Sequence, residues 1–234
     1  MIDPNFNFHS DAKGGDPDRT SPTLKKYHQL LWSKILPNGD YFKLEDNQPY
    51  HYLYYKSEEA VYALGSDTIT HSYRSHTKKK WLTEQIPYEV NDLFISAGNI
   101  ASYILFPKNK VRGNHTINQS RGVNRFIDDR FDLTLECIRR YYLNQTSPLY
   151  STLKRYEDFF KLFEDFRGYI DFFFLQDLYD ENSQTILFYL PFDDFKMPPS
   201  FKSVEDYLIY KKGVLDFVNK RKDRIVEYAK SRML

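Results

Sequence analysis

The sequence predicts an α+β fold in which an N-terminal helix and short antiparallel strands pack against a helix-rich C-terminal half. Of the 234 residues, 41% are hydrophobic and 18% aromatic, which is enough apolar surface for a large-grained buried core. Short aromatic segments separated by turn residues fill much of the first half. From about residue 124 onward, helical hydrophobic spacing dominates instead.

The N-terminal region divides near residue 20. Residues 1–20 include the polar, turn-forming run Gly14-Gly15-Asp16-Pro17-Asp18, so we expect a flexible arm, followed by a single domain over residues 21–234. Ser21 before Pro22 predicts a helix start, because serine caps the first turn and proline fits the first helical position. This helix should run to about Lys34. Its inward side chains should be Leu24, Tyr27 and Leu31.

Short strands are expected next. Aromatic segments at 41–45 and 50–55 flank the turn residues 46–49 and predict a hairpin. Residues 57–59 are expected to cap a short helix through Leu64, and the alternation over 68–73 predicts a strand. A further buried strand is predicted at 101–106, ended by Pro107.

The C-terminal half is predicted to contain three long helices, at 124–143, from 148 to about 166, and from 203 to about 232. Between the last two, the periodicity of residues 169–190 fits either a helix or strands. The turn residues 180–183 favour a hairpin.

Arg130 interrupts the pattern of the helix predicted at 124–143, because it falls among apolar positions while the other charged residues share one face. An unpaired buried guanidinium would cost several kcal/mol. Two explanations stay open. Arg130 pairs with a buried carboxylate and is structural, or it faces a pocket and binds a phosphate or carboxylate. The candidate carboxylates for the first explanation are Asp67, Asp171 and Asp177.

The acidic residues of the same predicted helix admit a second idea. Asp128, Asp132 and Glu136 repeat every four residues and could hold a divalent cation. The alternative is that acidic residues favour the start of the helix and arginines its end, with Asp132, Glu136 and Arg140 as a surface ladder. We therefore predict no metal site there. None is predicted at His71 and His76, which no cysteine pair precedes.

A basic, acid-free stretch precedes this helix. Residues 93–127 contain no Asp or Glu, and they lead into a helix N-terminus, where the dipole favours anions. The alternative is a solvated hairpin with a glycine turn. The candidate ligand-binding residues are Arg112, Asn118, Arg121 and Arg130, with Asp129 or Asp132 assisting a metal ion or a proton transfer.

Whole-chain properties exclude several classes of protein. The net charge of +1 gives no overall argument for nucleic-acid binding, although basic segments at 74–80 and 220–224 could join the acid-free stretch in space. The single cysteine, Cys137, excludes an intrachain disulfide. No apolar run is long enough to cross a membrane, and no signal peptide is evident, so we expect a cytoplasmic protein without membrane association.

Several segments together resemble an uncharacterised bacterial family, a domain of unknown function. They are Leu31-Trp32-Ser33-Lys34 with Leu36-Pro37-Asn38-Gly39, Thr116-Ile117-Asn118 with Arg121-Gly122, residues 129–142 (DRFDLTLECIRRYY), Asp158-Phe159-Phe160, and residues 190–195 (LPFDDF). The resemblance extends over nearly all of the chain after residue 20. It implies a bacterial single-domain protein and supplies no catalytic residues.

Two functions from different classes follow from these patterns. The first is binding of a phosphate-bearing ligand or nucleic acid through the candidate residues named above. The second is a non-catalytic protein-interaction module in which Arg130 is purely structural. The residues leave open whether the chain is an enzyme, which cofactor it uses, and its oligomeric state.

Overall fold

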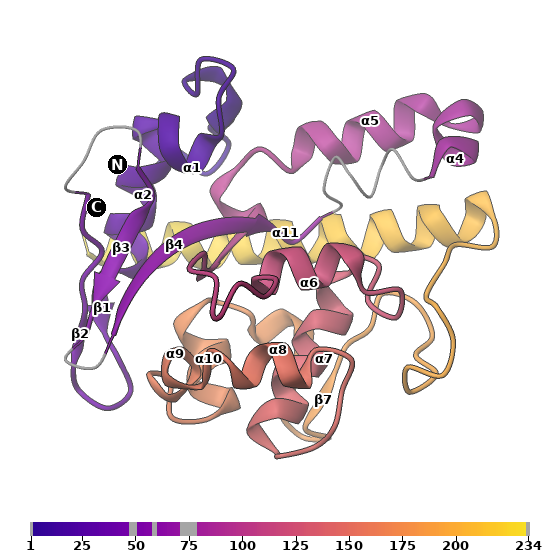
Figure 1. Cartoon of the computed structure of the whole chain (residues 1–234). Helices are drawn as coiled ribbons and strands as arrows, with labels where there is room; N and C mark the ends of the chain where they lie inside the picture. The colour runs from indigo at the N-terminus through magenta and orange to yellow at the C-terminus, as the bar shows by residue number, and fades with distance from the viewer. Residues whose placement is uncertain (1, 47–50, 58–59, 71–78, 233–234) are drawn as a thin grey trace.

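The computed structural model describes residues 2–46, 51–57, 60–70 and 79–232. In this part of the chain the α+β prediction is confirmed: an N-terminal helix and small antiparallel sheets precede a helix-rich C-terminal half. Figure 1 shows the longest helix, α11 (Val204–Ser231), crossing the whole molecule, with α5 on one side of it and α6 to α10 on the other. None of the described helices has the length and apolar run that a bilayer crossing requires.

The helices are mostly short. Before the strand β5 lie η1 (Phe8–Ser10), α1 (Pro17–Thr20), α2 (Pro22–Trp32), α4 (Lys80–Gln85), α5 (Pro87–Ser96) and η2 (Ile100–Ser102). After it lie α6 (Ile117–Val123), α7 (Phe131–Tyr142), α8 (Tyr150–Lys154), α9 (Glu157–Lys161), α10 (Phe166–Phe172), η3 (Gln176–Leu178) and α11.

The strands form three small antiparallel sheets. The main sheet has the order β3 (Leu53–Lys56), β4 (Val61–Thr68), β5 (Tyr103–Pro107). Two-stranded sheets join β1 (Lys34–Ile35) to β2 (Tyr41–Phe42), and β6 (Tyr179–Asp180) to β7 (Thr185–Ile186). The strand predicted at 101–106 is thus confirmed as β5, and the hairpin favoured around 180–183 is confirmed as β6–β7.

One other sequence prediction in this region is wrong. Residues 61–64 are strand, not the end of a helix, because β4 is the central strand and pairs along both edges. The pairing predicted between 41–45 and 50–55 is present in the described residues as one antiparallel bridge between Glu45 and Tyr54, while Tyr41 and Phe42 pair with β1. The turn at 47–49, the helix cap at 58–59 and the strand over 71–73 lie outside the described residues.

The N-terminal segment packs onto the rest of the chain, in contrast to the expected flexible arm. Phe8 is fully buried, with its ring 5.7 Å from that of Tyr27 in α2 and 5.9 Å from that of Tyr103 in β5. The Asp3 backbone N–H donates to the Tyr27 hydroxyl at 2.8 Å. The polar run 14–18 suggested a flexible arm, but it forms only a local turn that leads into α1.

Helix α2 begins as predicted. The Ser21 hydroxyl accepts the Leu24 backbone N–H at 3.0 Å, Pro22 opens the helix, and Leu24, Tyr27 and Leu31 are buried. Ser203 caps α11 in the same way. Serine caps of this kind are local signals, which is why they could be identified from the sequence.

The core is one continuous hydrophobic cluster of aliphatic and aromatic side chains. The ring of Phe163 lies 5.0–5.4 Å from those of four neighbours: Phe159, Tyr169, Phe172 and Phe173. A β-carbon at Gly168 would lie only 2.1 Å from the Phe163 carbonyl oxygen, so α10 approaches this backbone more closely than any other residue allows. Tilted and edge-on ring pairs each add about 0.5–1.5 kcal/mol beyond area burial.

The helix predicted at 124–143 begins later than expected. Helix α6 ends at Val123 and α7 begins at Phe131, so residues 124–130 form a non-helical connection between them. In this connection the consecutive residues Asp128 and Asp129 have φ of 45° and 65°, the left-handed region that aspartate tolerates better than most residues. The helical face predicted for residues 124–130 is therefore wrong.

The buried Arg221 connects helix α11 to the core. Arg221, which belongs to the basic segment 220–224, is fully buried. Its guanidinium donates to the backbone carbonyls of Phe173 at 3.1 Å, Ala101 at 2.7 Å and Tyr103 at 2.7 Å. The buried face of α11 also includes Tyr207 and Tyr210, whereas Leu208 is 40% exposed.

His28 links α2 to the main sheet. The Trp32 indole donates to His28 Nδ1 at 3.0 Å, and Nε2 lies 2.7 Å from the Ser66 hydroxyl of β4. An indole N–H can only donate, so Nδ1 has no proton and the neutral ring is protonated on Nε2. Burial, with a smaller effect of Arg221, lowers the pKa of His28 to about 3.

Acid is therefore expected to weaken the fold through His28. Between pH 6.5, the ordinary pKa of histidine, and about pH 3, the unfolded chain binds a proton at His28 that the folded chain does not. The free energy of unfolding therefore decreases as the pH is lowered through this range. The loss at pH 5 is about 2 kcal/mol. In urea unfolding at pH 7.5 and pH 5, the stability difference between the wild type and His28→Gln should narrow by that amount. An unchanged difference, or a His28 ring that NMR shows protonated at pH 5, contradicts this prediction.

Candidate functional site

Arg121 is the centre of a buried polar cluster between α6, β4 and α7. Its Nη1 pairs with Asp67 of β4, and its Nε donates to the Thr134 hydroxyl of α7 at 2.8 Å. Its Nη2 donates to the Asp129 carbonyl at 3.2 Å. Burial opposes the charge, but Asp67 and Asp129 outweigh it and raise the pKa of Arg121. Because the side chain is fully buried and held on three sides, it is not available to a ligand.

Arg130 stands at the N-cap of α7 and has a carboxylate partner two residues away. Its Nε donates to Asp132 Oδ1 at 3.1 Å, and its Nη2 pairs with Asp132 Oδ2. Asp132 Oδ2 also accepts the Tyr189 backbone N–H at 3.1 Å. Burial opposes the charge of Arg130, but Asp132 raises its pKa. The buried pair foreseen as the structural explanation is present.

The partner of Arg130 differs from the three proposed. Asp67 pairs with Arg121, Asp177 with Arg224 and Asp171 with Arg167. These carboxylates were chosen on the assumption that residue 130 lies within a helix. Because Arg130 instead precedes α7, its side chain can turn back along the first turn to Asp132.

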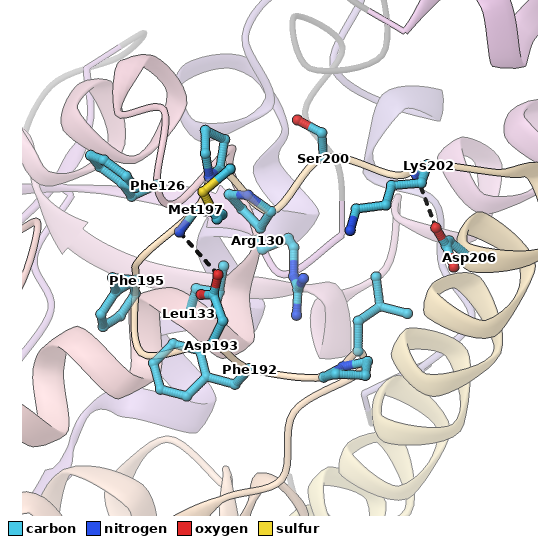
Figure 2. A pocket seen from close by; sticks show the side chains of 14 residues that line it. Phe126, Arg130, Leu133, Phe192, Asp193, Phe195, Met197, Ser200, Lys202 and Asp206 are labelled. Carbon is cyan, nitrogen blue, oxygen red and sulfur yellow. Dashed lines mark hydrogen bonds between the residues drawn. The ribbon is translucent and has the colours of Figure 1, made fainter.

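Arg130 also lines a surface pocket of about 390 Å³, which lies between the start of α7 and the loop of residues 190–202 (Figure 2). The apolar wall includes Phe126, Leu133, Phe192, Phe195, Met197 and Pro199. The Nη1 group of Arg130 makes no hydrogen bond with any residue that the structure describes. Figure 2 shows Arg130 and Lys202 directed into the same space from opposite sides.

The loop that forms the outer wall is anchored at several points. Asp194 and Phe195 are consecutive left-handed residues, with φ of 64° and 58°. Asp194 pairs with Arg140 of α7, whose guanidinium lies 5.0 Å from the ring centroid of Phe195. The Asp193 carboxylate accepts the Met197 backbone N–H at 2.9 Å. The pocket is therefore built by specific contacts rather than left between unrelated side chains.

Among the residues that the structure describes, four charged side chains line the pocket: Arg130, Lys202, Asp193 and Asp206. Asp206 Oδ2 accepts the Lys202 backbone N–H at 2.9 Å, and the Lys202 ammonium forms no ion pair with any described residue. The formal charges of the lining cancel. A bare ion would consequently gain little, while a ligand with an apolar part would gain from the aromatic wall as well.

The predicted ligand-binding residues separate into three groups. The first group consists of two pairs. Arg121 and Asp129 lie in the buried cluster, and Arg130 and Asp132 lie at its edge. The Asn118 amide donates to the Ser66 carbonyl of β4 at 3.2 Å. Arg112 is exposed in a turn, with φ of 51°, and does not line the pocket.

The carboxylates considered for a cation are each paired with a base. Asp128 pairs with Lys79 at 2.7 Å, Asp132 with Arg130, and Glu136 with Arg139 and Arg140. In the described part of the chain, no group of three or more acidic, histidine or cysteine side chains could hold a metal ion. His71 and His76 lie outside the described residues.

Lys202 was missed by the sequence analysis. It directly precedes α11, whose start at residue 203 was predicted, but nothing in the local pattern shows that residues 190–202 fold back over Arg130. The proline pair Pro198-Pro199 among aromatic residues is the only local sign of an ordered loop.

The structural role of Arg121 can be tested with a double-mutant cycle. Arg121→Gln leaves Asp67 buried without its charge partner and should cost about 3–5 kcal/mol of unfolding free energy. Asp67→Asn should cost a similar amount, and the double variant less than the sum, because each substitution removes the same pair. The measurement is chemical unfolding of all four proteins. A coupling energy below about 0.5 kcal/mol would show that the pair is not important for folding.

Comparison with known proteins supplies a family. The model of a family of unknown function, DUF6994, matches residues 2–225. The chain matches no curated protein and no solved structure. The match begins within the packed N-terminal segment and extends into α11, so it covers the pocket and the buried cluster. The chain belongs to this family of unknown function.

Proposed function

We propose that the chain binds a small organic anion, a phosphate or carboxylate attached to an apolar or aromatic body, in the pocket beside Arg130. The observation that carries this proposal is the pair of cations directed into one aromatic-walled space. Arg130 keeps one amino group free of described hydrogen-bond partners, and Lys202 has no described ion-pair partner. Planar guanidinium donors favour the oxygens of phosphate and carboxylate.

The fixed position of Arg130 adds to the argument. Asp132 holds two of its nitrogens, so the remaining amino group needs little reorganisation to meet a ligand. The apolar wall supplies the second part of the recognition, because the cancelled charges of the lining disfavour a bare ion. An aromatic phosphate thus fits the pocket better than inorganic phosphate does.

Nucleic-acid binding has less support. Of the basic residues considered for such a surface, Arg121 is fully buried, Lys79 is paired with Asp128, and Lys222 donates to Asn5 at 2.8 Å beside a different hollow. Strong binding to nucleic acid needs several cations along one face.

The protein-interaction alternative rests on a specific observation. The charge of Arg130 is already balanced by Asp132, as a purely structural arginine requires, and Met197 at the pocket wall is 66% exposed. Under this alternative the apolar wall contacts another protein, and Lys202 contributes no affinity for small anions.

A ligand screen separates these functions. Phenyl phosphate at 100 times its dissociation constant should add about 2.7 kcal/mol of stability, whereas inorganic phosphate and phenol at the same concentration should add far less. Lys202→Gln should weaken phenyl phosphate about tenfold, equivalent to about 1.4 kcal/mol. The readouts are thermal shift and isothermal titration calorimetry.

Lys196→Gln is the matched control, because Lys196 is an exposed lysine of the same loop that does not line the pocket. If both the Lys196 and the Lys202 variants lost the same affinity for phenyl phosphate, the loss would reflect the net charge of the protein and not a contact in the pocket. Absence of any shift with aromatic phosphates and carboxylates would reject the proposal and favour the interaction module, and a shift with oligonucleotides alone would favour nucleic acid.

A further inference from the structure

Lys34 of β1 is a lysine held in an aromatic cage. Its Nζ lies 4.2 Å from the ring centroid of Phe174, 4.4 Å from that of Phe172, and 5.2 Å from those of Trp32 and Tyr228. It donates to the Phe172 carbonyl at 2.5 Å. No carboxylate of the described residues forms an ion pair with it. A half-buried amine without a counter-ion among the described residues is unusual for a structural lysine, which ordinarily stays exposed or pairs.

The groups that face Lys34 weaken its hold on a proton. Burial lowers the pKa of Lys34 to about 7. The positive charges of Arg221 and Arg232 on the α11 side add to this decrease, and Asp171 of α10 opposes it. With a pKa of about 7, Lys34 populates both the ammonium and the neutral amine near neutral pH. The four rings and the Phe172 carbonyl stabilise the ammonium form and so oppose the effect of burial. Desolvation beside another cation is a known way to activate a lysine as a nucleophile.

Lys34 also borders open space. It lines a surface hollow of about 450 Å³ between β1 and α10, together with Pro37, Asp165, Arg167, Asp171 and Phe172. Asp171 there accepts the Gln176 amide at 2.9 Å, and Arg167 pairs with Asp171 and Glu181. The hollow contains carboxylates that can transfer protons and is separate from the Arg130 pocket, with which it shares no lining residue.

We propose that Lys34 is a nucleophilic amine that condenses with a small aldehyde or ketone entering this hollow, forming an imine. The neutral Nζ adds its lone pair to the carbonyl carbon, and the π electrons move to the oxygen. A proton passes from nitrogen to that oxygen, giving a carbinolamine. Protonation of the hydroxyl then releases water, the nitrogen lone pair forms the C=N bond, and the second N–H proton is lost. No oxidant or reductant is needed.

Competitive labelling tests the amine itself. Trace acetic anhydride is applied to the whole chain from pH 6 to pH 11, and each lysine is quantified by peptide mass spectrometry. Lys34 should reach half of its maximal reactivity near pH 7, whereas an ordinary lysine does so near pH 10.4. Lys80, whose side chain is 82% exposed, serves as the internal reference for loss of reagent. Half-maximal labelling of Lys34 near pH 10, or none before unfolding, overturns the proposal.

Trapping tests the carbonyl chemistry. With propionaldehyde and cyanoborohydride at pH 7, Lys34 should be alkylated at least about tenfold faster than Lys80, because a far larger fraction of it is neutral. Lys34→Arg keeps a cation in the cage and should abolish the fast site without changing the thermal midpoint greatly. Lys196→Gln, at an exposed lysine that lines neither hollow, should leave the fast alkylation of Lys34 unchanged. If Lys34 is acetylated with a midpoint near pH 7 but alkylated no faster than Lys80, the hollow does not admit a carbonyl compound and the proposal is rejected.

Discussion

Three guanidinium groups of the described residues are buried in one core, and each needs partners for its N–H groups, because an unpaired buried charge costs several kcal/mol. Arg121 pairs with a carboxylate of the sheet and a hydroxyl of α7, and Arg130 pairs with Asp132. Arg221 donates from Nε and Nη1 to backbone carbonyls, while its Nη2 has no hydrogen-bond partner among the described residues. The partners of Arg121 and Arg221 come from elements far apart in the sequence. The arginines therefore set where α6, α7 and α11 lie against the main sheet, and the aromatic side chains fill the remaining space.

The pocket beside Arg130 follows from the same requirement. The left-handed residues at 128–129 bring Arg130 to the start of α7, where Asp132 can hold it at the edge of the core. The Tyr189 backbone N–H shares that carboxylate, which ties the following loop to the same point. Under the proposed function, ligand recognition and helix placement would be different uses of one cluster.

Local signals in the sequence were sufficient for part of this structure. The Ser21 cap, the start of the last helix at residue 203 and the strand ending at Pro107 depend on near neighbours and were predicted. The sequence indicates that Arg130 interrupts an apolar pattern, but the predicted helix begins too early. Aspartates are common at helix starts, so nothing in the sequence shows that Asp128 and Asp129 are left-handed. The burial of Arg221 could not be found in this way, since its carbonyl partners are more than 40 residues away and carry no side-chain signature. Lys202 was missed for a related reason: a loop's return path leaves no periodic pattern.

The burial of Arg221 also has a consequence for the order in which the chain assembles. Its carbonyl partners Ala101 and Tyr103 lie 120 and 118 residues earlier in the chain, among the most sequence-distant contacts of the core. Loop-closure entropy makes such contacts slow to form. Until residue 221 has been synthesised and docked, those carbonyls have no guanidinium donor, and the aromatic residues beneath α11 remain open to solvent. A chain still on the ribosome is in that state, and completion of its core has to wait for the last helix.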